Sequence, residues 1–188
     1  MSTIKKKIAV LALSLGTLCA NAQTDITSTY LTNPSFEDDD TSTMAVDATR
    51  GAYTATTLKG WSLTGGYSVS DIMTADATAT DNNFGRPGTP SDGKQMYYIR
   101  HSWQTATANL TQSVKLPKGK YRLSVDSKCV SGSSHTVKVV AQKEGTNLPW
   151  STSMPTAWNT TNVDFELTAE AAVSMGLTIN FGSGSGGA

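Results

Sequence analysis

The sequence has little cysteine, little histidine and no long apolar run after its start, and each shortage excludes a class of protein. Only two of its 188 residues are cysteines, Cys19 and Cys129, so a scaffold held by several disulfides is excluded. Its two histidines, His101 and His135, stand in no catalytic or zinc-binding motif. No later apolar run approaches the roughly 20 residues of a membrane-spanning helix. The chain must therefore fold around an ordinary hydrophobic core.

The start of the chain has the organisation of a secretory signal peptide. Lys5-Lys6-Lys7 is a basic region, and the apolar stretch from Ile8 to Leu18 is too short to span a bilayer. Ala20-Asn21-Ala22 is a small-x-small cleavage signal, so we expect cleavage after Ala22 and a secreted, periplasmic or cell-surface location. A lipoprotein signal with Cys19 as the lipidated residue is the alternative, but the residues before Cys19 fit it poorly.

Removing this leader leaves twelve Lys and Arg against fifteen Asp and Glu, so the mature chain is slightly acidic. No basic patch remains, which argues against nucleic acid as a partner. The remainder has the size of one domain. We divide the chain into a leader at 1–22, a domain at 23–181 and a Gly/Ser-rich tail at 182–188, which is a linker or a truncated loop.

Alternation of apolar and polar residues predicts an all-β domain. It is clearest from Leu110 to Val125, where two alternating runs flank Pro117-Lys118-Gly119-Lys120. Period-two alternation is typical of half-buried strands, and Pro and Gly favour turns, so this stretch predicts an antiparallel hairpin. No segment keeps a helical period, which favours an antiparallel β-sandwich of the jelly-roll type. The other strands that we expect are 24–32, 52–56, 67–69, 95–101, 136–142, 163–167 and 173–181.

Several motifs occur in an order that resembles a known fold family. They are Asn33-Pro34-Ser35-Phe36-Glu37, Gly60-Trp61, Gly93-Lys94-x-x-Tyr97, Leu110-Thr111-Gln112-Ser113-Val114, Leu116-Pro117-x-Gly119-x-Tyr121-x-Leu123, and Trp158 before the 163–167 strand. This order resembles the galactose-binding-like jelly rolls, which include many carbohydrate-binding modules of secreted bacterial polysaccharide-degrading proteins. The resemblance covers Leu31 to Phe181, and its motifs are more specific for the fold than for the ligand.

The resemblance implies two packed antiparallel sheets and a structural calcium near Phe36-Glu37, with Glu37 as a ligand. In the family, an Asp-Asn pair on a closing strand completes that site, and this sequence has no such pair after Phe181. We therefore expect the sandwich to lack its closing C-terminal strand and the 173–181 strand to offer a bare edge. Asp38-Asp39-Asp40 is a weaker metal candidate, because its spacing does not match an EF-hand loop.

Glycan binding without catalysis is the function that we predict. Aromatic rings stack on the apolar faces of sugars, and polar side chains bond their hydroxyls. In the 95–101 strand we place Tyr97 and Ile99 in the core, because the opposite choice would bury Arg100. The candidate ligand-binding residues are side chains expected off the core: Tyr98, Arg100, Trp103, Arg122, Asp126 and Trp150. If the two strands that carry four of them share a sheet, those four lie on one surface.

Two other functions compete with glycan binding. A structural or adhesive module that binds protein partners is the alternative. A glycosidase needs only two carboxylates, so composition leaves it open, but the fold resemblance argues against it. The partners that we expect are a polysaccharide and a fused or neighbouring catalytic domain.

Overall fold

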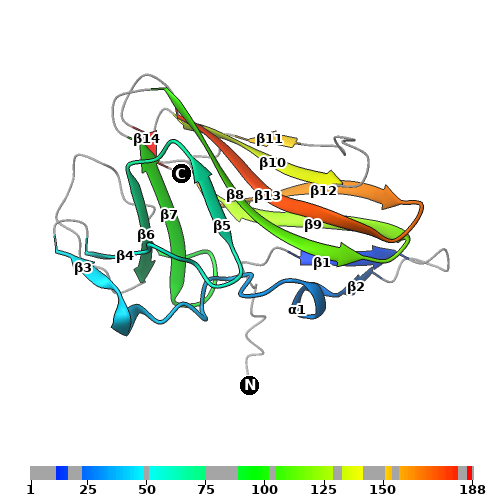
Figure 1. The fold of residues 1–188 in the computed structure, drawn as a ribbon, viewed down its shortest axis with the longest axis horizontal. Helices are drawn as coiled ribbons and strands as arrows, with labels where there is room; N and C mark the ends of the chain where they lie inside the picture. The colour runs from blue at the N-terminus through cyan, green and yellow to red at the C-terminus, as the bar shows by residue number, and fades with distance from the viewer. Residues whose placement is uncertain are drawn as a thin grey trace.

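Figure 1 shows a computed structural model of the chain, in which two sheets stack as layers and a third sheet lies at one end. All strand pairs are antiparallel, so the predicted all-β sandwich is confirmed. The structure describes residues 12–16, 23–48, 51–74, 89–101, 105–128, 133–141, 151–153, 157–181 and 186–187. The candidates Trp103 and Trp150 lie outside these residues.

We name the three sheets by their place in Figure 1. The front sheet has the order β11-β10-β13-β8-β5 and contains β5 (Ser62–Gly65), β8 (Ala106–Leu116), β10 (Ser133–Ala141), β11 (Ser151–Ser153) and β13 (Ala171–Phe181). The back sheet has the order β12-β9-β1-β2 and contains β1 (Ala12–Gly16), β2 (Gln23–Asp25), β9 (Gly119–Ser127) and β12 (Asn159–Leu167). The side sheet has the order β14-β7-β6-β4-β3 and contains β3 (Ala45–Asp47), β4 (Ala52–Thr54), β6 (Val69–Thr74), β7 (Gln95–His101) and β14 (Gly186–Gly187).

Within the described ranges, helix is confined to two short pieces, α1 (Thr27–Tyr30) and η1 (Thr41–Thr43). No helix among the described residues has the length and apolarity to cross a membrane. The strand predicted at 24–32 is therefore wrong over most of its length. The Asp25 carboxylate accepts a hydrogen bond from the Thr27 amide at 2.9 Å, which turns the chain out of the strand and into α1.

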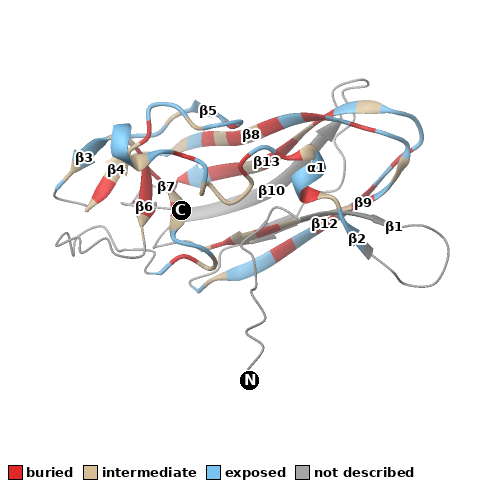
Figure 2. Ribbon diagram, turned by 90° about the horizontal axis from the view of Figure 1, so that it is seen from below, coloured by how far each residue is buried: buried red, intermediate tan, exposed pale blue. Residues whose placement is uncertain are grey.

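The hydrophobic core lies between the front and back sheets, as the red bands of Figure 2 show. Alternate residues of four long strands face it: Leu110, Val114 and Leu116 of β8; Tyr121, Leu123 and Val125 of β9; Val163, Phe165 and Leu167 of β12; Val173, Met175, Ile179 and Phe181 of β13. Burying one such side chain stabilises the fold by roughly 1.5–3 kcal/mol, so these strands dominate its stability.

The two central strands of the sequence are present, but they do not form the predicted hairpin. β8 pairs with β13 and β5 in front, and β9 pairs with β12 and β1 behind. The turn at Pro117 therefore carries the chain from one layer to the other. The Tyr121 hydroxyl donates to the Pro117 carbonyl at 2.6 Å and ties this corner, as a corner tyrosine does in other sandwiches. The hairpin prediction failed because alternation fixes the face of a residue and not the partner of its strand.

The long strand near the C-terminus is central in the front sheet. β13 pairs with β8 on one side and β10 on the other, so the bare edge expected at 173–181 is wrong. After it, Gly186–Gly187 pairs with β7 opposite Arg100 and His101. The edge prediction failed because the sequence does not reveal that an earlier strand returns beside the last one.

Both faces of β7 are buried, which overturns the predicted solvent exposure of Tyr98 and Arg100. These side chains are 2% and 6% exposed. β7 belongs to the side sheet and β9 to the back sheet, so the four strand candidates do not share a surface. The far face of β7 is covered by a second small cluster formed by Ala52, Met73, Met96 and Tyr98, with Val69 and Trp158 packed against it.

Candidate functional site

A tight loop at Asn33 positions the residues of the candidate site. The Asn33 side-chain nitrogen donates to the Asp39 carboxylate at 2.7 Å, and the Asn33 side-chain oxygen accepts from the Asp38 amide at 2.9 Å. The Trp61 indole N–H donates to the Asn33 carbonyl at 2.9 Å. Asn33 has a φ of 48°, a left-handed conformation that Asn tolerates better than most residues. The loop thus locks Trp61 beside the segment that carries Phe36.

Glu37 anchors the start of β7 to this loop. Its Oε1 accepts hydrogen bonds from the Lys94 amide at 2.8 Å and the Gln95 amide at 2.7 Å. Gly93 precedes them with a φ of +67°, and a Cβ there would collide with the Glu37 carboxylate. The Glu37 and Gly93-Lys94 motifs are therefore in contact. Their separation in the sequence gave no reason to expect this contact.

The described contacts give the Glu37 carboxylate a structural role. One Glu37 oxygen is already committed to two amides, and no three His, Cys, Asp or Glu side chains gather in the described ranges. Asp38 contacts the Lys59 ammonium at 3.3 Å. Hydrogen bonds from the Ser42 hydroxyl and amide lower the pKa of Asp40. The described contacts around Glu37 thus fit a structural anchor better than a calcium site, and calcium binding stays a prediction.

Three aromatic rings pack together above the Asn33 loop. Phe36 lies 5.6 Å from Trp61 and 5.2 Å from Tyr97 between ring centroids. Phe36 has a φ of 63°, which is rare for a bulky residue and is the kind of backbone strain that clusters at functional sites. The Tyr97 hydroxyl lies 2.7 Å from the Ser70 hydroxyl, and burial raises the pKa of its phenol. The rings form one rigid platform.

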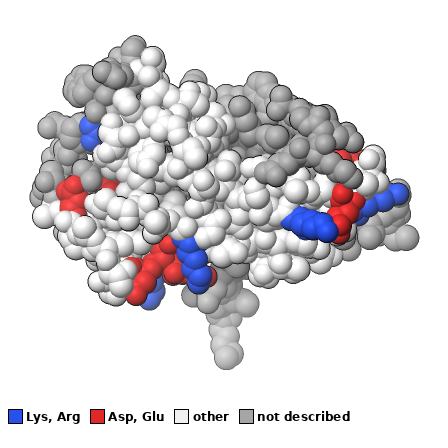
Figure 3. Space-filling model, in the orientation of Figure 1, with Lys and Arg blue, Asp and Glu red and all other residues white. Residues whose placement is uncertain are grey.

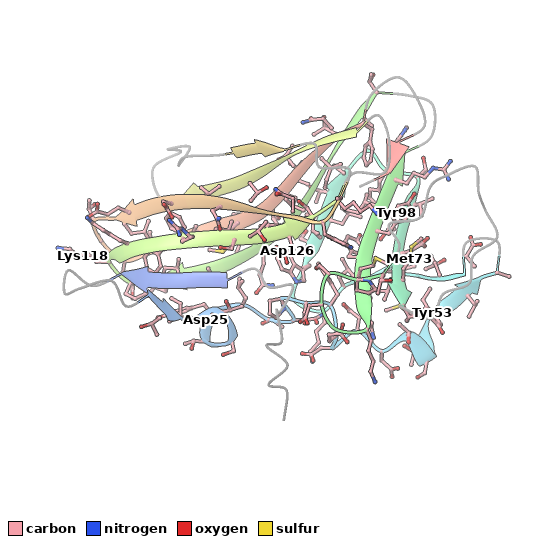
Figure 4. The ribbon with its side chains drawn as sticks, turned by 180° about the vertical axis from the view of Figure 1, so that it is seen from behind. Asp25, Tyr53, Met73, Tyr98, Lys118 and Asp126 are labelled. Atoms are coloured by element: carbon pink, nitrogen blue, oxygen red, sulfur yellow. The ribbon has the colours of Figure 1, made fainter. Side chains whose placement is uncertain are left out.

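The platform is the floor of a cleft between β7 and the end of β9, with a volume of about 110 Å³. In Figure 4, Tyr98 on β7 and Asp126 on β9 mark its two sides. Partly exposed polar residues and one aromatic line it towards solvent: Ser91, Gln95, Asp126, Lys128 and Trp158. An apolar floor with a polar rim is the usual composition of a small-ligand site.

Two side chains of this rim carry the strongest signals for ligand binding. The Gln95 Oε1 atom is buried and has no hydrogen-bond partner among the described residues, although the great majority of buried polar atoms have one. The Trp158 indole N–H donates to the Thr89 carbonyl at 2.7 Å, which holds its ring in place. In the sequence Trp158 stands out only as a fold landmark, and Gln95 does not stand out at all, because a sequence does not show which buried atoms lack a partner.

The outer face of the back sheet carries a ladder of polar pairs across β9 and β12. Arg122 bonds both oxygens of Asp164, at 2.6 and 2.8 Å, and this contact lowers the pKa of the Asp164 carboxyl. The other rungs are Ser124–Asn162 at 2.6 Å, Asp126–Thr160 at 2.5 Å and Lys120–Glu166 at 3.9 Å. The predicted outward position of Arg122 and Asp126 is confirmed, but only Asp126 reaches the cleft.

Among the described residues, Lys115 is the only charged side chain on the outer faces of β8 and β13 in the front sheet (Figure 3). Short neutral side chains pair across it: the Thr178 hydroxyl donates to Asn109 at 2.8 Å, and the Thr107 hydroxyl donates to Asn180 at 3.2 Å. The ion pair of Lys115 and Glu170, 2.5 Å apart, lies at the end of the β8–β13 ladder. The described lining of the cleft, by contrast, carries one carboxylate, Asp126, and one ammonium, Lys128.

Comparison with solved structures identifies the architecture. The structure titled as TmCBM61 in complex with β-1,4-galactotriose superposes with a TM-score of 0.53 at 18% identity, over 84% of this chain and 91% of that one. The two chains share an antiparallel β-sandwich fold of the jelly-roll type. The enzymatically active domain of tailspike protein 4 of bacteriophage CBA120 aligns with a TM-score of 0.45 at 12% identity, over 77% of this chain and 20% of that one. Neither a family model nor a curated protein matches the sequence.

Proposed function

We propose that this jelly roll is a non-catalytic module that binds glycan at the cleft between β7 and β9. The observation that carries the proposal is the Gln95 side chain, which lines the aromatic-floored cleft and whose Oε1 atom is buried without a described partner. A sugar hydroxyl would donate to it, while the Trp158 ring and the Phe36 platform would take the apolar face of the sugar. Asp126 and Lys128 would bond hydroxyls at the rim.

The acid content of the cleft supports binding rather than hydrolysis. Asp126 is the only carboxylate among the described residues that line the cleft. Glycoside hydrolysis ordinarily uses two carboxylates that flank the scissile bond, one of them as an acid. Asp126 also accepts a hydrogen bond from Thr160, so its role is more easily that of a hydrogen-bond acceptor than of a proton donor.

A galactan fragment is the first ligand to test, because the TmCBM61 structure is titled as a complex with β-1,4-galactotriose. A cleft of about 110 Å³ admits part of one sugar ring, so the affinity of a single module should lie in the millimolar to micromolar range. We also propose that residues 1–22 are cleaved during export, which would place the module where polysaccharides and a neighbouring catalytic domain are found.

Calorimetric titration with galactotriose, and with cellotriose for comparison, tests this function. Gln95→Met keeps the size of the side chain and removes the acceptor, so it should weaken binding about 10-fold at an unchanged melting temperature. Asp126→Asn should weaken binding by less, because the amide still bonds a hydroxyl. Glu166→Gln, at the far end of the same ladder, is the matched control and should bind normally. If the module binds no glycan in a panel of polysaccharides, glycan binding is wrong and the alternative, an adhesive module that binds protein partners, is favoured.

A further inference from the structure

The back sheet uses part of the predicted leader as a strand. β1 lies between β9 and β2 in the sheet order, and its five residues pair antiparallel with Lys120 to Ser124 of β9. β12 occupies the other side of β9. If export removes residues 1–22, β9 loses this neighbour and exposes a row of backbone N–H and C=O groups. Such an edge is a ready template for another strand.

The register of β1 defines what this edge accepts. Leu13 pairs with Leu123 and Leu15 pairs with Tyr121, so the apolar positions of β1 match the inward positions of β9. Residues paired across an antiparallel ladder share a face of the sheet. The outward positions of β9 are matched by small residues, because Ala12, Ser14 and Gly16 pair with Ser124, Arg122 and Lys120.

This pattern disfavours a second copy of β9 as the partner of the open edge. Arg122 already forms its bidentate contact with Asp164 on the outer face, and Lys120 lies near Glu166. A neighbouring β9 would add further long charged side chains beside these pairs, whereas β1 adds only small residues. The edge therefore fits a strand of Leu-x-Leu type with small residues between and around the leucines.

We propose that processing of the leader opens β9 as a docking site for an extended segment of another protein chain. The segment lies antiparallel to Lys120 to Ser124, with apolar residues opposite Leu123 and Tyr121 and small residues opposite Arg122 and its neighbours. This is strand addition, in which main-chain hydrogen bonds supply affinity and alternate side chains supply specificity. The inference rests on the proposed cleavage and not on glycan binding.

A peptide of residues 5–18 is the natural probe, because it contains β1 and the lysines that keep it soluble. The full chain is expressed in an exporting host, and mass spectrometry checks that the purified protein starts at Gln23. Binding of the labelled peptide is followed by fluorescence anisotropy. A matched peptide with Leu13→Ser, Ser14→Leu, Leu15→Gly and Gly16→Leu keeps the composition and moves the leucines to the outward face. It should bind at least 10-fold more weakly.

Backbone methylation supplies a second matched pair of peptides. Successive N–H groups of a strand point to opposite edges, so methylation at residues 13 and 15 or at residues 14 and 16 blocks one edge only. One methylated peptide should lose binding at least 10-fold and the other should keep it. The unprocessed precursor should bind no peptide, because β1 fills the edge.

Several results would overturn the proposal. They are equal binding of all peptides, no binding to processed protein, or a purified protein that still starts at Met1. A dimer of processed protein that the peptide does not dissociate would assign the edge to a second copy instead. Titration with galactotriose in the same preparations reports on glycan binding separately, so failure of one proposal does not mimic failure of the other.

Discussion

β7 and β9 look alike as sequences and differ in the fold. Both strands alternate, and both carry an arginine at a position that alternation assigns to solvent, Arg100 in β7 and Arg122 in β9. In the structure Arg122 remains on an outer surface, bonded to Asp164, while Arg100 is 6% exposed. The difference arises because a second cluster covers the far face of β7, whereas no described element covers the outer face of β9.

A polar stripe on a strand is therefore not by itself a binding surface. The polar side chains of β9 form hydrogen bonds with side chains of β12, and these cross-strand pairs stabilise the sheet. β7 instead has its stripe buried together with the fully buried Asp71 of β6, which lies opposite Tyr98. Ligand binding is better sought where the two strands approach each other, because the cleft opens there.

The largest expected effect is the difference in unfolding free energy between replacing a tyrosine on the covered face of β7 and replacing an exposed tyrosine. Tyr98→Ala removes a ring that is 2% exposed and should lower the free energy of unfolding by about 3–5 kcal/mol, the usual cost of an aromatic-to-alanine change in a core. Tyr67→Ala removes a ring that is 42% exposed and should cost about 0.5 kcal/mol or less. Urea denaturation of both variants measures the difference. Similar losses would mean that the far face of β7 is open in solution.

The two arginines give the next largest contrast. Arg100→Ala removes a buried positive charge on the face that also holds Asp71, diagonally across the β6–β7 pair. It should cost about 3 kcal/mol, because a buried carboxylate tolerates the loss of nearby positive charge poorly. Arg122→Ala breaks an exposed pair and should cost about 1 kcal/mol or less. Urea denaturation of both variants measures the two costs. Equal costs would mean that Arg100 is not in a more buried environment than Arg122.

The long strands and their core faces could be predicted from the sequence. The pairing partners of these strands and the residues that cover their outer faces could not. The bounds of β7 were predicted correctly at Gln95–His101, and the inward residues Leu110, Leu123 and Phe165 followed from period two. Strand partners and covering layers depend on contacts between distant segments, which no local period encodes. For the site, Asp126 was recognised by its parity, whereas Gln95 and Trp158 matter only because the fold brings β7 and β12 together.

A smaller effect is expected at Gln112, a buried polar residue of β8 that bonds the backbone of Thr32. Its side chain accepts from the Thr32 amide at 2.7 Å and donates to the Thr32 carbonyl at 2.9 Å, so it acts as a strand partner. Gln112→Ala should cost about 1–3 kcal/mol, since it leaves buried backbone groups unpaired. Thr111→Ala, one position earlier on the opposite face of β8, is the control and should cost less. Chemical denaturation of both variants provides the measurement.

The smallest effect expected is the pH dependence of the Arg122–Asp164 rung. The hydrogen bond from Arg122 holds the pKa of the Asp164 carboxyl below its usual value, which is about 3.9 in an unfolded chain. A carboxyl with a depressed folded pKa adds stability above the unfolded value and loses it as the pH falls through the folded value. The melting temperature of the wild type should therefore exceed that of Asp164→Asn at pH 6, and the gap should shrink as the pH falls below about 4. Ser124→Ala, which removes the neutral rung to Asn162 on the same ladder, should leave this pH dependence unchanged. A gap that is constant across this range would mean that the rung owes its stability to packing along β9 and not to charge.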